Sequence, residues 1–214
     1  MKVLVACEYS GIVRDAFIKK GHNAISCDIL PSESSLGEHY QGDVMDILYE
    51  DWDMMIAHPP CTYLAVSGAA WFYHPEDKHL PTDQRRPHPK HPNRRQLQKE
   101  ALDFIRLLLD APIDKIALEN PVGVISTKIR KPDQIIQPYM FGHSESKKTC
   151  LWLKNLPLLE PTNQVEPEVR IYTKSGKSHG KWWIDTWKLP PDERWKVRSA
   201  TFQGIAEAMA EQWG

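Results

Sequence analysis

The chain has 214 residues, of which 41% are hydrophobic and 26% charged, a balance that is ordinary for one globular domain with a buried core. No apolar stretch approaches the roughly 18 to 20 residues that span a bilayer, and the N-terminus has the pattern of a strand, so we expect a cytoplasmic protein without membrane contact. The formal net charge of −1 gives no general indication of nucleic-acid binding.

The first sixty residues predict three strands and one helix. Residues 2–7 are a nearly continuous apolar run, as expected of a strand that is buried on both faces of a parallel sheet. Apolar residues at helical spacing over 12–17 predict a helix that ends at Gly21. Residues 23–27 and 53–57 predict two more strands, and prolines follow the second one.

The alternation of strands and helices continues to the end of the chain. We expect a long amphipathic helix over 97–108, strands over 115–118 and 149–153, and a last helix over 200–213. Short apolar strands that alternate with helices predict an α/β fold built on a parallel sheet.

Two segments are irregular, and both are rich in proline and in basic residues. They are residues 69–96 and residues 154–198, and the second contains four tryptophans. Residues 83–99 carry 6 Lys or Arg against 1 Asp or Glu, and residues 170–198 carry 8 against 3. Because phosphate contacts need local positive charge, both segments are candidates for nucleic-acid binding.

The cysteines and histidines predict neither a disulfide framework nor a metal site. The four cysteines are far apart and none forms a C-x-x-C pair, so we expect free thiols and no structural zinc. The histidines of the first irregular segment are broken up by prolines, which favours exposed loop residues over metal ligands. We therefore expect no metal.

Polar residues gather where the predicted strands end. In parallel α/β sheets, ligands bind outside the carboxyl ends of the strands. The chain places its least core-like residues at these ends: Glu8, Tyr9, Ser10 and Gly11; Asp28; His58, Pro59, Pro60 and Cys61; and Glu119, Asn120 and Pro121.

Cys61 is a candidate nucleophile. Two prolines stiffen the backbone directly before it at a strand end, which would direct its thiol into the crevice. Cysteine is a good nucleophile once it is deprotonated. The alternative is a small buried residue, as most free cysteines are.

Glu119 is a candidate proton donor. It follows the apolar residues 116–118, so we expect partial burial to raise its pKa, which suits protonation of a ring nitrogen. The alternative is a carboxylate that caps the following turn.

Asp28 and Asp43 could accept hydrogen bonds from ribose hydroxyls and an adenine amino group, and the turn over 7–11 could wrap such a cofactor. Acids at strand ends are also common without a ligand.

Taken in order, these elements resemble the cytosine-C5 DNA methyltransferases, in particular short bacteriophage members. Gly42-Asp43, Pro60-Cys61 and Glu119-Asn120 carry the resemblance, which covers about residues 1–153 and the C-terminal helix. It implies a Rossmann-like S-adenosylmethionine-dependent methyltransferase sheet flanked by helices. The core would comprise 1–153 plus 199–214, with a small substrate-contacting lobe over 154–198.

The resemblance also implies roles for single residues. Cys61 would add to C6 of a cytosine flipped out of DNA, Glu119 would hydrogen-bond N3 and the exocyclic amine, and Lys148 would contact O2. The residues implied for S-adenosylmethionine are Cys7, Glu8, Tyr9, Ser10, Gly11, Asp28, Ile29, Asp43, Val44 and Pro59. Those expected to contact DNA are Arg85, Arg86, Arg94, Arg95 and Lys147. RNA or a nucleotide stays open as the substrate, no obligate protein partner is indicated, and the cell would be bacterial or phage-infected.

The chain also departs from the family pattern, and two other functions stay open. Thr62 and Pro121 replace the family's Gln and Val, and Lys147 and Lys148 stand where the family has arginine. One alternative is an amino-methyltransferase, because His58-Pro59-Pro60 superficially resembles a Pro-Pro-aromatic motif. The other is a catalytically inert nucleic-acid-binding protein that keeps the fold.

Overall fold

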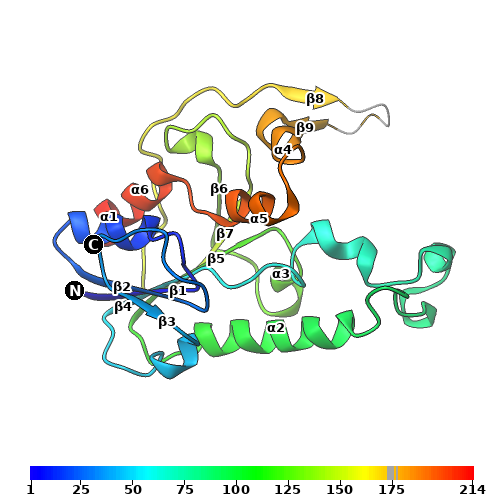
Figure 1. Ribbon diagram of the computed structural model, residues 1–214, viewed down its shortest axis with the longest axis horizontal. Helices are drawn as coiled ribbons and strands as arrows, with labels where there is room; N and C mark the ends of the chain where they lie inside the picture. Colours follow the sequence, from blue (N-terminus) through cyan, green and yellow to red (C-terminus); the bar gives the residue numbers. More distant parts are fainter. Residues whose placement is uncertain (173–175, 177) are drawn as a thin grey trace.

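In the computed structural model of the protein, which describes residues 1–172, 176 and 178–214, the chain is organised around one seven-stranded sheet (Figure 1). The order across this sheet is β3-β2-β1-β4-β5-β7-β6. Its strands are β1 (Lys2–Ala6), β2 (Asn23–Asp28), β3 (His39–Gln41), β4 (Met54–Ala57), β5 (Lys115–Pro121), β6 (Gln134–Ile136) and β7 (Thr149–Lys154).

The expected Rossmann-like α/β sheet flanked by helices is confirmed, but the sheet is mixed and not wholly parallel. The pairs β1–β2, β1–β4, β2–β3 and β4–β5 are parallel, whereas β7 pairs antiparallel with both β5 and β6. A parallel neighbour needs a crossover connection, usually a helix. Residues 137–148 between β6 and β7 hold only the 3₁₀ turn η5 (Pro138–Met140), so the chain turns straight back.

Helices cover both faces of the sheet. As Figure 1 shows, α1 (Ile12–Lys19) and α6 (Gln203–Trp213) lie on one side, and α2 (Arg94–Leu109) and α3 (Ile125–Lys128) lie on the other. Side chains alternate along β1, so Val3 and Val5 pack in the α1–α6 layer while Leu4 and Ala6 pack in the α2–α3 layer. This double burial explains why the strand is apolar at every position from Val3 to Ala6.

The two irregular segments lie outside the sheet. We call residues 66–93 the arm; it contains the 3₁₀ helices η2 (Val66–Trp71), η3 (Pro75–His79) and η4 (Thr82–Gln84) and extends to the right in Figure 1. A further 3₁₀ turn, η1 (Val44–Asp46), precedes β4.

Residues 154–198 include a second, two-stranded sheet of β8 (Arg170–Tyr172) and β9 (Ser178–Gly180), followed by α4 (Lys181–Thr186) and α5 (Pro191–Ser199). Lys174 and Lys177 of the basic segment lie outside the described residues. The division into a core and a lobe stays a prediction.

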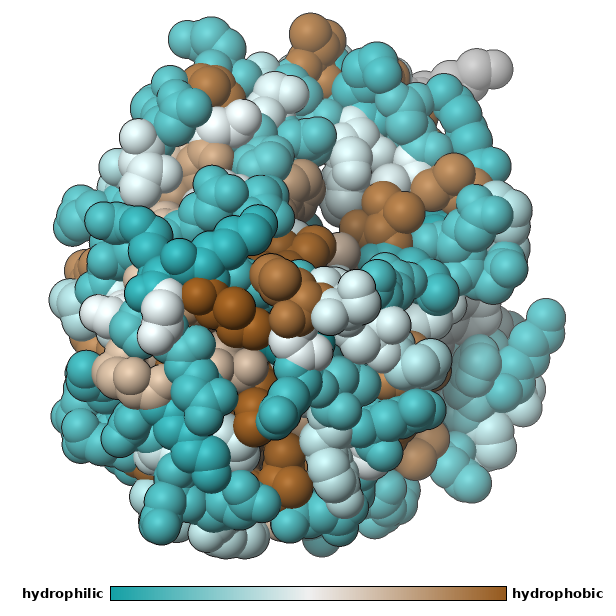
Figure 2. Space-filling model, turned by 60° about the vertical axis from the view of Figure 1, so that its left-hand side comes forward, coloured by the Kyte–Doolittle hydropathy of each residue, from teal (hydrophilic) through white to brown (hydrophobic). Residues whose placement is uncertain are grey.

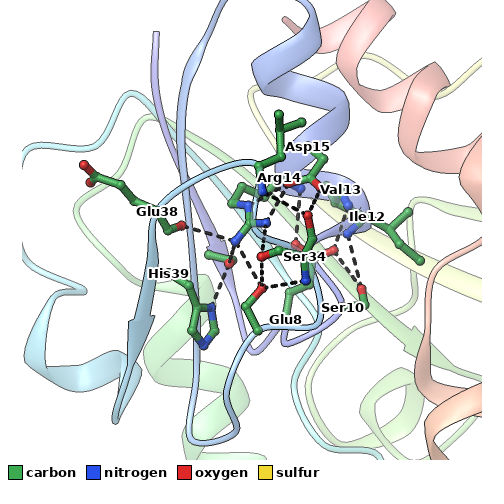
Figure 3. A network of polar contacts seen from close by, with 12 residues as sticks. Glu8, Ser10, Ile12, Val13, Arg14, Asp15, Ser34, Glu38 and His39 are labelled. Carbon is green, nitrogen blue, oxygen red and sulfur yellow. Dashed lines mark hydrogen bonds and ion pairs between the residues drawn. The ribbon is translucent and has the colours of Figure 1, made fainter.

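The first strand-to-helix turn is fixed by a buried polar network (Figure 3). Arg14 has no exposed surface, and it donates to the hydroxyl of Ser26 at 3.0 Å and the carbonyl of Ser34 at 3.2 Å. Its guanidinium also lies 2.7 Å from the carboxylate of Asp15. Gly11 precedes the helix with φ of 76°, and a Cβ there would lie 2.6 Å from the Arg14 guanidinium, so glycine is required.

The surface is mainly polar. Figure 2 shows one face that is largely hydrophilic, with hydrophobic side chains gathered near its middle. None of the helices within the described part of the chain is both long enough and apolar enough to cross a membrane.

Candidate active site

A cavity of about 810 Å³ opens at the carboxyl ends of β1, β2 and β4, where the strand order reverses and α/β sheets bind ligands. This volume lies within the usual range for small-molecule sites. The predicted residues that line it are Cys7, Tyr9, Asp28, Ile29, Asp43, Val44 and Cys61. Four others, Glu8, Ser10, Gly11 and Pro59, are not among its lining residues.

Asp28 and Asp43 each have one carboxylate oxygen that accepts no hydrogen bond from the described residues. Oδ1 of Asp28 accepts from the backbone N–H of Leu30 at 3.0 Å, and Oδ1 of Asp43 accepts from that of Met45, also at 3.0 Å. No residue that the structure describes hydrogen-bonds to Oδ2 of either acid. The local backbone therefore orients both carboxylates and leaves an acceptor free on each.

In the turn between β1 and α1, one residue lines the cavity and the next one stabilises the fold. Cys7 lines the cavity with a left-handed φ of 59°, the conformation that a glycine would adopt most readily. Glu8 instead faces α1, and its carboxylate accepts from the backbone N–H of Val13 at 2.7 Å and of Arg14 at 3.2 Å (Figure 3). Glu8 thus caps the helix, and its contact with a cofactor stays a prediction.

Cys61 lies at the cavity, four residues after Ala57, the last residue of β4 that pairs with β5. Pro59 is buried, whereas Cys61 is exposed, and the carbonyl of Cys61 accepts from the N–H groups of Leu64 and Ala65, both at 2.9 Å. Although the residue is exposed, loss of water around the thiol raises its pKa, and the charge of Glu119 raises it further. The positive charge of Lys147 opposes both effects.

Glu119 is buried, but its pKa is not raised as expected. Burial does raise the pKa of this carboxyl, yet the hydrogen bond from His58 and the positive charges of Lys147 and His58 outweigh burial, so the pKa lies below its ordinary value. Nδ1 of His58 lies 3.0 Å from Oε2 of Glu119. Burial alone predicted a raised pKa for Glu119. That prediction was wrong because His58 and Lys147, which are distant in sequence, lower this pKa.

Lys147 lies next to Glu119, whereas Lys148, the lysine expected to contact the base, does not line the hollow at Glu119. A small hollow beside the main cavity is lined by Glu119 and Lys147, together with Thr149, Thr201, Phe202 and Ile205. Nζ of Lys147 donates to the carbonyl of Ala200 at 3.3 Å. Lys148 is exposed and acts on the pKa of Cys150 instead, because successive side chains next to a strand point in opposite directions.

The four arginines expected to contact DNA have different surroundings. Arg94 is 8% exposed and donates to the carbonyl of Thr62 at 2.6 Å, so it fastens the segment after Cys61 to α2 and does not face solvent. Arg86 is paired with Asp77 at 2.6 Å. Arg85 donates to the carbonyl of Leu80, and Arg95 is exposed. Contact of these residues with nucleic acid stays a prediction.

Helix α5 forms the opposite wall of the cavity, which the sequence did not indicate. Its lining residues are Pro191, Arg194, Trp195, Arg198 and Ser199. The ring of Trp195 lies 5.6 Å from that of Tyr9, and the Tyr9 hydroxyl lies 3.2 Å from Oγ of Ser199, so the helix is attached to the first turn. Most residues of α5 are polar and they form no apolar stripe, so the sequence does not predict a buried face for this helix.

His58 also lines the cavity, although it was not among the expected site residues and entered only through the superficial His58-Pro59-Pro60 resemblance. A histidine at the end of an apolar strand is the only signal in the sequence that could have found it. Within residues 1–172, 176 and 178–214, no three His, Cys, Asp or Glu side chains gather closely enough to hold a metal ion.

No protein-family model and no curated protein matches the chain. Among solved structures, the chain is similar to the crystal structure of an E. coli protein that is inferred to be a DNA modification methyltransferase encoded within a prophage. The two are 13% identical with a TM-score of 0.44, and the match covers 92% of this chain and 69% of that one. At this level of similarity, function has to be inferred from the site itself.

Proposed function

We propose that the chain is an S-adenosylmethionine-dependent methyltransferase that acts on C5 of cytosine in DNA, with Cys61 as the nucleophile. The observation that carries this proposal is the position of Cys61. Its thiol lies at a cavity whose far end offers two carboxylates, and it is close enough to Glu119 and Lys147 for their charges to change its pKa. A nucleophile, a carboxylate and a cation thus meet at the edge of a cofactor-sized cavity.

The residues present fit the cofactor. The free oxygens of Asp28 and Asp43 suit ribose hydroxyls and the adenine amino group, and the exposed side chain of Ile29 and the ring of Trp195 offer apolar contact to an adenine ring. Bound there, S-adenosylmethionine would supply an electrophilic methyl group on a sulfonium.

Cys61 would make the C5 carbon nucleophilic. Its sulfur forms a bond to C6, the C5–C6 double bond shifts its electron pair towards C4 and N3, and N3 takes up a proton. C5 then bonds to the methyl group, which the cofactor held by Asp28 and Asp43 would supply from its sulfonium as the sulfonium becomes a neutral thioether. Loss of the C5 proton to water restores the C5–C6 double bond and expels the Cys61 thiolate, while N3 releases its proton.

Glu119 would handle the proton on N3. Its lowered pKa makes it a carboxylate in the free protein, so it can accept a hydrogen bond from the exocyclic amine. A base that closes over the carboxylate removes its remaining water, and such desolvation raises a carboxyl pKa. The carboxyl then shares a proton with N3 as the ring gains charge from the thiolate.

A covalent trap tests the proposal directly. DNA that contains 5-fluorocytosine should form a stable complex with the protein when S-adenosylmethionine is present, because fluorine cannot leave C5 as a proton does. Cys61→Ala should abolish this complex, and Cys150→Ala, which removes a buried thiol, should not.

Mass spectrometry of digested DNA identifies the modified nucleoside. A protein that methylates the exocyclic nitrogen and never forms the adduct would be an amino-methyltransferase. A protein that binds DNA and methylates nothing would be the inert alternative.

A further inference from the structure

His58 extends the central sheet into the site. It follows β4 directly, and its backbone N–H donates to the carbonyl of Ala6 at 2.9 Å, so it is held like a strand residue. Its side chain is 8% exposed, and the imidazole lines the cavity. The chemistry proposed for Cys61 and Glu119 gives this imidazole no role.

The hydrogen bond to Glu119 fixes which nitrogen carries the hydrogen. Nδ1 lies 3.0 Å from Oε2 of Glu119, and an ionised carboxylate can only accept, so Nδ1 donates. Nε2 is buried and has no partner in the described residues. The ring therefore donates through Nδ1.

This bond decides which oxygen of Glu119 is free. Oε2 is occupied by His58, and none of the described residues hydrogen-bonds to Oε1. The terminal torsion of a glutamate is broad when nothing holds it. The neighbouring Asn120 donates from Nδ2 to the carbonyl of Pro59 at 2.8 Å, which ties the ends of β4 and β5 together. The backbone at the end of β5 is thus held by Asn120, and the carboxylate of Glu119 is held by His58.

Three other ionisable groups face this pair from three elements. Glu8 comes from the turn after β1, and the charge of His58 lowers its pKa against the effect of burial. Lys147 comes from the segment before β7 and lowers the pKa of Glu119. Cys61 follows β4, and the charge of Glu119 raises its pKa. A change at His58 should therefore reach Cys61 through Glu119.

We propose that His58 is a positioning residue for Glu119, which holds Oε2 through Nδ1–H so that Oε1 alone meets the cytosine ring. The same bond keeps the carboxylate ionised next to the Cys61 thiol. The first effect rests on the proposed function, whereas the second exists in the protein without DNA or cofactor and can be measured there.

The kinetic test removes the donor and then restores it. His58→Leu fills the same space without a donor, and we expect single-turnover methylation to fall about 10²-fold, the loss that misplacement of a catalytic group produces. Because His58 lines the cavity, the Kd for S-adenosylmethionine is measured on the same variant, and it should change far less than the rate. His58→Asn keeps an N–H near the position of Nδ1 and should recover most of the rate. His22→Ala, a change between α1 and β2 that is not in the cavity lining, serves as the control.

The second test measures alkylation of Cys61 by iodoacetamide in the free protein, followed by peptide mass spectrometry. In His58→Leu, the hydrogen bond and charge of His58 no longer lower the Glu119 pKa and only Lys147 still does, so this pKa rises and the charge of Glu119 raises the pKa of Cys61 less. Cys61 should therefore react faster than in the wild type. Glu119→Gln should have the same effect, and the double variant should react no faster than Glu119→Gln alone.

The outcomes separate this inference from the proposed function. If His58→Leu is folded and turns over within a few-fold of wild type, or if its effect on alkylation adds to that of Glu119→Gln, His58 does not act through Glu119. Should His58→Leu melt below the assay temperature, His58→Phe repeats the measurement with a ring in place. Failure of Cys61 to trap 5-fluorocytosine would remove the proposed function and leave the alkylation result standing.

Discussion

The protein buries two polar clusters near the ends of its central strands, and they differ in how completely they are satisfied. Around Arg14, hydroxyls, carbonyls and the Asp15 carboxylate accept from the guanidinium, and among the described residues none of its nitrogens lacks a partner. Around Glu119, Nε2 of His58 and Oδ1 of Asn120 are buried without a partner in the part of the chain that the structure describes. Since an unsatisfied buried group is unfavourable, we expect the second cluster to contribute less to stability than the first.

Glu119→Gln should give the largest effect, and it should be an effect on activity. The amide keeps the shape but cannot hold the proton that N3 needs. General acid–base assistance is typically worth about 10²- to 10⁴-fold, or roughly 3 to 5.5 kcal/mol of barrier. We expect that loss in kcat, measured by single turnover, with the Tm nearly unchanged. A variant that melts early yet keeps its rate would place Glu119 with Arg14 as a structural residue.

Arg14→Ala should show the opposite pattern. Removing one partner of a buried charged network typically lowers the free energy of unfolding by about 3–5 kcal/mol, which denaturant unfolding would measure. Arg106→Ala is the matched control, because Arg106 forms an exposed pair with Asp103 at 2.8 Å and should lose at most about 1 kcal/mol. Equal losses in the two variants would contradict the comparison.

Asp43→Asn should weaken cofactor binding while it leaves the stability of the fold unchanged. Asparagine caps a helix as well as aspartate does, so the hydrogen bond to the Met45 N–H and the Tm should be retained. The charge-assisted hydrogen bond to the cofactor should be lost, which is worth about 1.5–3 kcal/mol, or roughly a 10- to 150-fold higher Kd. Calorimetry with S-adenosylmethionine measures this, and an unchanged Kd would place the cofactor elsewhere.

Arg95→Ala should give the smallest effect. Arg95 is exposed and its guanidinium lies 4.5 Å from the ring of Tyr73, so its loss should hardly change stability. If it contacts a phosphate, the slope of log Kd against log salt should flatten by about 0.9. Arg94→Ala, which removes a buried anchor of the arm, should lower the Tm instead. An unchanged slope for Arg95→Ala would show that this part of the arm does not touch the backbone of DNA.

The sequence predicted those parts of the fold whose residues are apolar in a regular pattern. The strands β1, β2, β4, β5 and β7 and the helices α1, α2 and α6 were expected close to where they occur. The three-residue strands β3 and β6 are too short to carry a pattern. The antiparallel direction of β7 was missed because a strand buried on both faces reads the same in either direction.

The site was predictable where a residue type and a strand end coincide. This held for Cys61, Asp28 and Asp43, which all line the cavity. The exchange of Lys147 for Lys148 was not predictable, because the direction of a side chain in the irregular segment before β7 depends on where the strand begins. The pKa of Glu119 was not predictable either, since it depends on His58 and Lys147, which are distant in sequence.

The register between β4 and β5 limits how the length of this chain can vary. Ala57 pairs with Leu118, and His58 and Glu119 follow one residue further along the two strands. Because successive side chains of a strand point to opposite faces, one residue inserted in either strand would turn Cys61 or Glu119 away from the other. An insertion or deletion in residues 54–58 or 115–119 would therefore separate these side chains, whereas the arm, which lies outside the sheet, can change in length without shifting this register.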